Sequence, residues 1–110
     1  MTDKVIVLST CPSREEAKRI ARGLVEERLA ACVNVVDGVL SVYQWQGSVH
    51  ESDEVMLVVK SRRDLLGRLQ ERLAGMHSYE VPEVMAIPVA EGLPAYIEWM
   101  DRELEPSGNS

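Results

Sequence analysis

Two continuous apolar runs of strand length predict the centre of the fold. They occupy residues 5–8 and residues 55–59, and most of their side chains are β-branched. Such runs, which do not alternate with polar positions, are typical of strands that are covered on both faces. We therefore predict that a strand over residues 4–11 and another over about residues 49–60 lie in the middle of a β-sheet.

A third strand is predicted over about residues 33–45, and its second half carries no charge. No Asp, Glu, Lys or Arg occurs between Asp37 and Glu51. We expect Asp37-Gly38 to form a bulge, and residues 46–48 to turn the chain back into a hairpin with the next strand. Because an uncharged strand edge invites association with other chains, this strand should be paired along its length.

Two stretches of the chain have apolar residues at helical spacing, and each begins after a residue that can cap a helix. Ser13, with Glu16 three residues later, has the pattern of a capping box. Ser61 and Asp64 offer a second N-terminal cap. These caps predict two helices, which end near residues 30 and 75. Their apolar positions recur at intervals of three and four residues and are Ala17, Ile20, Ala21 and Leu24 in the first helix and Leu66, Leu69, Leu73 and Met76 in the second.

A fourth strand and a short third helix complete the chain. The strand is expected over residues 81–89, and it contains Pro82 and Pro88. Because proline has no amide proton to donate to a neighbouring strand, we place this strand at an edge of the sheet. The helix is expected over residues 95–104. The side chains expected to face inward from this helix are Tyr96 and either Trp99 or Met100.

The predicted order, βαββαβ followed by a helix, indicates an α+β protein with a ferredoxin-like sandwich. In this fold two helices cover one face of an antiparallel sheet with the strand order 4-1-3-2. The two apolar runs fall in the central strands of this order, and the prolines fall in an edge strand. We expect a single domain over residues 1–104, followed by a disordered tail, EPSGNS, over residues 105–110.

Composition and charge exclude several classes of protein. The chain has 110 residues and a net charge of −6, which repels a nucleic-acid backbone. No apolar run approaches the ~20 residues of a membrane span, and the first ten residues lack the pattern of a signal peptide. Cys11 and Cys32 are the only cysteines. We therefore expect a cytoplasmic protein with reduced thiols, bound neither to nucleic acid nor to a membrane.

The predicted sheet leaves one face and one edge strand uncovered. Two helices cover only the other face, and the uncharged strand lies at the edge. Tyr43 and Trp45 on this strand need an apolar partner, which closed symmetric assemblies commonly supply. The residues therefore predict an oligomer in which each hairpin pairs with a neighbouring subunit, without fixing the number of subunits.

Motifs spread over residues 5–99 resemble those of a known family. The matching positions are Thr10, Glu16-Ala17, Ile20-Ala21, residues 29–34, Ser41-x-Tyr43-x-Trp45-x-Gly47, Glu54, Lys60, His77-x-Tyr79-Glu80-x-Pro82-Glu83, Pro88, Gly92, Tyr96 and Trp99. In these motifs the chain resembles the CutA divalent-cation tolerance proteins, which are small trimeric relatives of the PII-type signalling proteins. The resemblance implies a ferredoxin-like subunit, a homotrimer built by the long hairpins, and a role in tolerance to copper and other divalent metals.

Three positions depart from the family's pattern. Ser48 stands where Lys is common, and Ser61 stands where Thr is common. Some members bind copper with a thiol on the first strand at the position of Ser9, whereas here Cys11 follows two residues later. A copper ligand therefore does not carry over directly from the family to this chain.

His77 is the strongest candidate for a metal ligand, because neutral imidazole binds copper and similar ions. Glu80, Glu83 and Cys11 could complete its coordination shell. The end of the first strand should meet the start of the fourth, which would bring Cys11, His77 and Glu83 together. No spacing motif for metal binding is present. The alternative is that His77 and Glu80 only hold a loop in place by hydrogen bonds.

The other candidates belong to a cleft or interface between subunits. The two aromatic residues of the uncharged strand are expected to anchor the interface or to line a ligand cleft. Cys32 is either a small buried apolar residue or a reactive thiol. Lys60 is expected to meet an anion or to pair with Glu54 or Glu83. The residues assigned to this cleft or interface are Cys32, Tyr43, Trp45, Lys60, Tyr79 and Glu80.

Two functions follow, and neither is enzymatic. The sequence has no Ser/His/Asp order and no glycine-rich phosphate loop, so we do not expect an enzyme. The favoured function is that of a homotrimer that responds to copper and other divalent ions by binding them. The alternative is a PII-like signalling or scaffold trimer that binds a small molecule or a protein partner in clefts between subunits.

Overall fold

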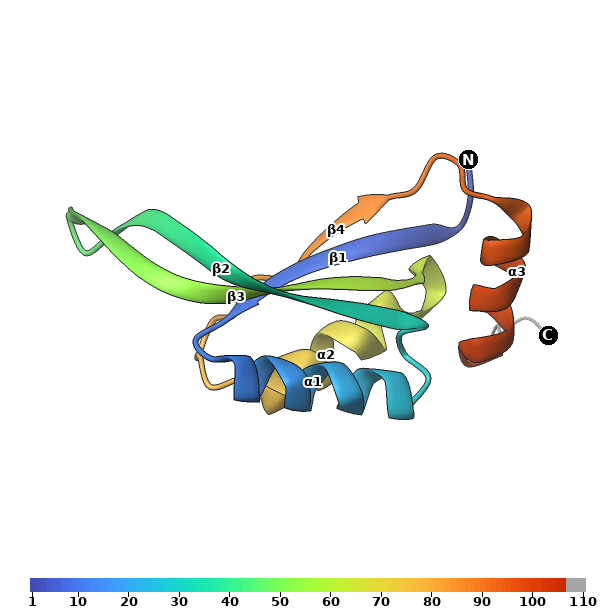
Figure 1. The fold of residues 1–110 in the computed structure, drawn as a ribbon, viewed down its shortest axis with the longest axis horizontal. Helices are drawn as coiled ribbons and strands as arrows, with labels where there is room; N and C mark the ends of the chain where they lie inside the picture. The colour runs from blue at the N-terminus through green and yellow to red at the C-terminus, as the bar shows by residue number, and fades with distance from the viewer. Residues whose placement is uncertain (107–110) are drawn as a thin grey trace.

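The protein folds into an antiparallel sheet with two helices on one face. The computed structural model describes residues 1–106, and within them four strands pair in the order β2-β3-β1-β4. Helices α1 and α2 cover the same face of the sheet, and α3 stands at one end of it (Figure 1). The elements are β1 Lys4–Cys11, α1 Arg14–Glu26, β2 Cys32–Trp45, β3 Ser48–Arg62, the 3-10 turn η1 Arg63–Leu65, α2 Leu66–Met76, β4 Met85–Pro88 and α3 Pro94–Glu103. The predicted α+β ferredoxin-like fold, with its long hairpin and C-terminal helix, is confirmed.

The two apolar runs form the centre of the sheet, as predicted. β1 and β3 are the middle strands, and Val7, Leu57 and Val59 are fully buried. The helices bury their apolar stripes against these strands through Ala17, Ile20, Leu24, Leu69 and Leu73. Removal of this apolar surface from water is the main force that stabilises the fold. The core therefore lies between the helices and the face of the sheet that they cover.

The two predicted helix caps have different outcomes. The Ser13 hydroxyl oxygen accepts a hydrogen bond from the Glu16 amide at 3.2 Å, and α1 begins directly after it. Ser61 does not cap α2, because its backbone pairs with Val5 in the sheet. Its hydroxyl instead donates to the Leu29 carbonyl oxygen at 2.6 Å, which ties β3 to the chain that leaves α1. The prediction for the start of the second helix was therefore wrong.

The fourth strand is shorter than predicted, although its place at the edge is confirmed. β4 covers Met85–Pro88 and pairs with residues 5–8 of β1. Pro82 lies outside it, because this part of the chain does not pair with β1, and its neighbours Glu80, Val81 and Glu83 line a pocket with residues of the hairpin. The first half of the expected strand over residues 81–89 therefore does not join the sheet and lies beside this pocket instead.

Helix α3 closes the end of the sheet opposite the hairpin tip (Figure 1). Its inward side chain is Met100, which is 4% exposed, whereas Tyr96 stays exposed rather than facing inward. The Arg28 guanidinium holds the end of α3 by donating to its last carbonyl oxygens at 2.6–3.3 Å. The predicted tail begins with Glu105, whose amide donates to the Arg28 carbonyl oxygen, and residues 107–110 lie outside the described residues.

The hairpin of β2 and β3 projects far beyond the helices (Figure 1). Its strands pair from Cys32↔Lys60 to Trp45↔Ser48. The two residues between them, Gln46 and Gly47, have φ angles of 50° and 83°, as a tight two-residue hairpin turn requires. Within the described residues no helix is long and apolar enough to cross a membrane.

The predicted bulge in β2 is confirmed, and it changes which side chains share a face. Between the pairs Val36↔Met56 and Val39↔Glu54, β2 has two residues, Asp37 and Gly38, where β3 has only Val55. One extra residue reverses the alternation of side chains beyond it. Tyr43 and Trp45 therefore share a face with Glu54, on the side of the sheet that the helices leave open.

Candidate functional site

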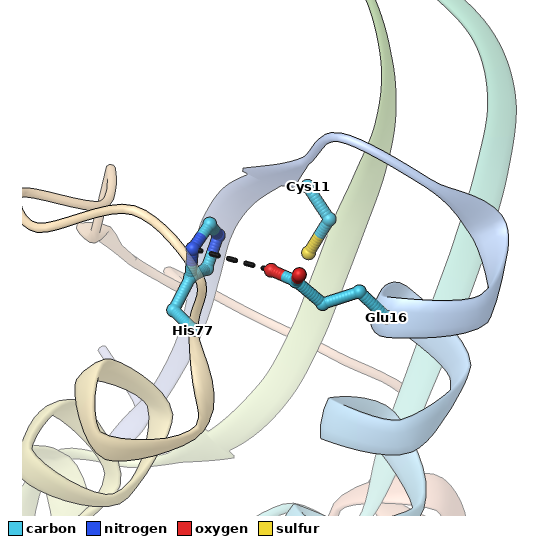
Figure 2. A group of neighbouring side chains, drawn as sticks. All are labelled: Cys11, Glu16 and His77. Carbon is cyan, nitrogen blue, oxygen red and sulfur yellow. Dashed lines mark ion pairs between the residues drawn. The ribbon is translucent and has the colours of Figure 1, made fainter.

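Three potential metal ligands meet at the C-terminal end of β1. Cys11 ends β1, Glu16 lies in the first turn of α1, and His77 directly follows α2. One ligand atom from each lies within 4.8 Å of the other two, and all three residues are buried. Figure 2 shows the three side chains pointing toward one another from their separate elements. The group is called the Cys11–Glu16–His77 cluster below.

The cluster forms because α1 begins where α2 ends. The guanidinium of Arg19 in α1 donates to the carbonyl oxygen of Met76, the last residue of α2, at 3.2 Å. The Ser78 amide donates to Oε2 of Glu16 at 3.1 Å. These contacts fix the connector after α2 against the first turn of α1, so that His77 faces the end of β1.

Hydrogen bonds on both sides define the state of the His77 ring. Nε2 lies 2.8 Å from the Thr10 carbonyl oxygen, which can only accept, so Nε2 carries a proton and donates. Nδ1 accepts from the Tyr79 amide at 3.0 Å, so it carries no proton. The neutral ring therefore presents Nδ1 toward Oε2 of Glu16, 3.4 Å away. Its face lies against Tyr79, with ring centroids 4.7 Å apart.

The charged states of the other two side chains follow from their surroundings. Burial, and then the charges of Glu16 and Glu54, raise the pKa of the Cys11 thiol to about 11, so it is protonated at neutral pH. Burial also acts to raise the pKa of Glu16, but hydrogen bonds from Ser78, together with the nearby charge of Arg19, lower that pKa overall. The cluster thus offers a thiol, a carboxylate and an imidazole whose Nδ1 acts as an acceptor.

Glu83 lies in a different place from the one predicted. The ligand atoms that meet Cys11 and His77 within the described residues belong to Glu16, and Glu83 lines a pocket of about 710 Å³ on the open side of the sheet. Glu80 lines the same pocket. The reason is that residues 79–83 turn from the cluster toward the hairpin before β4 begins.

The aromatic residues of the predicted cleft are brought together in this pocket. The residues that line it are Thr10, Ser41, Val42, Tyr43, Trp45, Glu54, Tyr79, Glu80, Val81 and Glu83. The Tyr79 hydroxyl donates to Oε2 of Glu54 at 2.7 Å. Burial first, and then Glu54, raise the pKa of the Tyr79 phenol, so this hydroxyl remains a donor at neutral pH. Tyr79 thus connects the two sites, with its amide on His77 and its hydroxyl in the pocket.

Lys60 and Cys32 lie at the other end of the hairpin. They pair with each other across β2 and β3, six residues along β3 from Glu54. At about 3.4 Å per residue this separation is about 20 Å, so the expected ion pair of Lys60 with Glu54 does not form. Lys60 instead places its ammonium 5.8 Å from the centroid of the Tyr96 ring. Cys32 is partly exposed and lies outside the pocket.

Glu16 is the member of the cluster that sequence reasoning missed. Its spacing from Ser13 explained it as half of a capping box, but its carboxylate accepts from the Ser78 amide rather than from Ser13. A sequence signal did exist, because Cys11 and Glu16 are separated by one tight connection between a strand and a helix. A residue in the first turn of that helix necessarily lies near the end of the strand.

Comparison with known proteins adds to this geometry. A family model described as CutA1 divalent ion tolerance protein matches residues 5–103. The divalent-cation tolerance protein CutA of Thermus thermophilus is 50% identical over 95 residues, which cover 86% of this chain and 92% of that protein. The chloroplastic protein CutA of Arabidopsis thaliana is 45% identical over 96 residues, which cover 87% of this chain and 53% of that protein. The structure of the divalent cation tolerance protein Cut A1 from Thermus thermophilus superposes with a TM-score of 0.91 and 47% identity, over 93% of this chain and 99% of that one.

These matches agree with one another in extent and in fold. They cover nearly all of the described chain, and the names they carry describe tolerance to ions rather than an enzymatic reaction. The resemblance inferred from the motifs is therefore confirmed. The chain belongs to the CutA family of divalent-cation tolerance proteins.

Proposed function

We propose that this protein acts in tolerance to copper and other divalent metal ions as a cytoplasmic homotrimer that binds the ion and does not transform it. The observation that supports ion binding is the Cys11–Glu16–His77 cluster, in which three ligand atoms lie within 4.8 Å of one another. Membership in a family named for divalent-ion tolerance supports the same role.

The donor set of the cluster suits a soft or borderline ion. Thiolate and imidazole ligands favour copper and zinc, whereas calcium and magnesium require mostly oxygen ligands. His77 would bind through Nδ1, which faces Glu16, while Nε2 donates to the Thr10 carbonyl oxygen. A ligating histidine usually has such a second hydrogen bond, which fixes the orientation of its ring. The residues present therefore fit the ion that the family name implies.

Two features of the cluster set conditions on binding. The Tyr79 amide must leave Nδ1 of His77, and the Cys11 thiol must lose its proton. Binding should therefore move Tyr79, whose side chain lines the pocket on the open side of the sheet. It should also release a proton for each ion bound.

Zinc provides a redox-inert probe for the proposed site, and copper is then tested by competition. Calorimetric titration of the assembled protein should show one zinc ion per subunit. Cys11→Ser and His77→Gln should each weaken binding by about tenfold or more, because each removes one metal ligand. Cys32→Ser is the matched control, since it removes the other cysteine, which lies outside the cluster, and should leave binding unchanged.

The pH dependence of the same titration tests the role of the thiol. Since the pKa of Cys11 is about 11, protons compete with the metal throughout the neutral range. The affinity should rise with pH by about tenfold per unit from the thiol alone. In Cys11→Ser this slope should disappear. Equal affinities for the parent protein, Cys11→Ser and His77→Gln would show that ions bind elsewhere.

A further inference from the structure

Tyr79 joins the Cys11–Glu16–His77 cluster to the open face of the sheet. Its amide donates to Nδ1 of His77 at 3.0 Å, and its hydroxyl donates to Oε2 of Glu54 at 2.7 Å. The connection runs past the end of β1, where Nε2 of His77 donates to the Thr10 carbonyl oxygen. One residue therefore contacts both the proposed ion site and the face of the sheet that the helices leave uncovered.

An ion at the cluster and the Tyr79 amide compete for the same atom. A neutral imidazole has one nitrogen without a proton, and the lone pair of that nitrogen either accepts a hydrogen bond or binds a metal ion. In His77 this nitrogen is Nδ1, because Nε2 donates to the Thr10 carbonyl oxygen. An ion bound at Nδ1 therefore breaks the hydrogen bond from the Tyr79 amide.

The other hydrogen bonds around the cluster are compatible with a bound ion. The two oxygens of a carboxylate accept at several positions, so Glu16 can ligate an ion while it still accepts from the Ser78 amide. The bond from His77 to Thr10 also persists, because it uses the other ring nitrogen. The displacement therefore begins at Tyr79, within residues 77–84, which form neither a helix nor a strand.

Displacement of Tyr79 changes the face on which subunits are proposed to meet. Glu54, which accepts from the Tyr79 hydroxyl, is 9% exposed and shares this face with Tyr43 and Trp45 of the hairpin. In the proposed trimer a neighbouring subunit shields the hairpin from water. When Tyr79 moves, the Glu54 carboxylate loses a donor in that shielded place, which is unfavourable.

We propose that an ion at the cluster weakens the association of subunits by displacing Tyr79 from Glu54. The inference rests on the proposed function, because it requires both the ion site and the trimer. The ion-free position of Tyr79 is the one that suits the covered face, so ion binding and assembly oppose each other. Since such coupling is reciprocal, separated subunits bind the ion more tightly than assembled ones. The assembly thereby responds to the concentration of the ion.

Subunit exchange between unlabelled and isotope-labelled assemblies measures this coupling, and native mass spectrometry follows it even when few subunits are free. Saturating zinc should accelerate exchange of the parent protein by about tenfold, which is the effect expected from one hydrogen bond to a charged group. His77→Gln lacks the ligand, so zinc should leave its exchange unchanged. An equal acceleration of His77→Gln would mean that zinc acts elsewhere, and it would overturn the proposal.

Tyr79→Phe tests the connection itself, because it removes the hydroxyl that reaches Glu54 and keeps the amide and the ring. Without zinc this variant should exchange subunits about as fast as the zinc-loaded parent, and zinc should add little. It should also bind zinc about tenfold more tightly than the parent in a calorimetric titration, because the ion no longer has to break the bond to Glu54. Damage to the site would lower this affinity instead.

Tyr43→Phe is the matched control. It removes a hydroxyl that pairs with Ser52 Oγ at 2.8 Å on the same face of the hairpin, away from the cluster. Zinc should bind to this variant and accelerate its exchange as in the parent. An acceleration as large in Tyr79→Phe as in Tyr43→Phe would overturn the proposal, because the effect then does not pass through Tyr79.

Two results show which proposal fails. A parent protein that binds no zinc, or that is a single subunit, overturns the proposed function and this inference together. An assembly that binds zinc and exchanges its subunits at an unchanged rate overturns this inference alone.

Discussion

Ser9 and Ser61 bury their hydroxyl groups in different surroundings. Both side chains are fully buried on the central strands, yet only Ser61 has a hydrogen-bond acceptor, the Leu29 carbonyl oxygen at 2.6 Å. Within the described residues the Ser9 hydroxyl has no partner. A buried polar group without a partner is unfavourable, whereas a satisfied one stabilises the fold modestly.

Replacing each serine by alanine should therefore have opposite effects on stability. Ser61→Ala removes a donor from a buried carbonyl oxygen and should lower the free energy of unfolding by about 1–2 kcal/mol. Ser9→Ala removes an unsatisfied hydroxyl and should leave this free energy unchanged or raise it. Urea denaturation of both variants at one protein concentration measures the difference. A larger loss for Ser9→Ala than for Ser61→Ala would mean that Ser9 has a partner after all.

At the residue scale, the sequence predicted which elements meet but not which carboxylate joins them. The approach of Cys11 and His77 follows from strand order alone, and the structure brings them together. Glu83 was expected beside them because the last strand was predicted to begin at residue 81, whereas the carboxylate that meets them belongs to Glu16. The path of the connector before β4 depends on contacts with the hairpin, and no local sequence pattern reports those contacts.

At the element scale, the predictions that the structure confirms came from sequence patterns that fit only one kind of local structure. Continuous apolar runs indicated the central strands, and Asp37-Gly38 indicated a bulge, because each pattern fits few alternatives. Ser61 and Asp64 were ambiguous, since the same residues also suit the end of a strand. Asp64 pairs with Arg62 at 2.6 Å instead of capping a helix. Pairing in the sheet, which depends on residues far away in the chain, decided between the two interpretations.

Gly38 and Gly67 provide a matched test of the bulge. A Cβ at either position would have no neighbour within 4 Å, but only Gly38 has a positive φ, of 76°. Alanine at Gly38 is therefore strained and should lower the free energy of unfolding by about 1 kcal/mol. Alanine at Gly67, inside α2, should raise it by up to about 1 kcal/mol.

The bulge also bears on the pocket, because it places Tyr43 and Trp45 on the face of Glu54. Denaturation measures the stability of both alanine variants. A stabilising effect of Gly38→Ala would contradict a bulge that depends on glycine.

At the scale of the whole molecule, the subunit is long and unevenly covered. It measures 48 × 25 × 22 Å, and the hairpin accounts for its elongation (Figure 1). β2 is an edge strand, and Leu40, Val42, Trp45 and Val49 of the hairpin are each more than half exposed. Isolated apolar residues on a surface are common, but several on an uncharged edge strand and its hairpin partner indicate an interface. This arrangement supports association of subunits through the hairpin, which the proposed homotrimer requires.

A charge on the hairpin should therefore prevent assembly. Val42→Lys introduces an ammonium group at a position that is 59% exposed in the subunit and buried in the proposed trimer. An unpaired charge in an apolar interface costs several kcal/mol, so the concentration needed for assembly should rise about 100-fold or more. Val25→Lys on α1, which is 42% exposed and lies beside the first residues of β2 rather than on the projecting part of the hairpin, is the control and should assemble like the parent. Sedimentation velocity over a range of concentrations measures the assembly of both variants. A parent protein that sediments as a single subunit at micromolar concentration would refute the trimer.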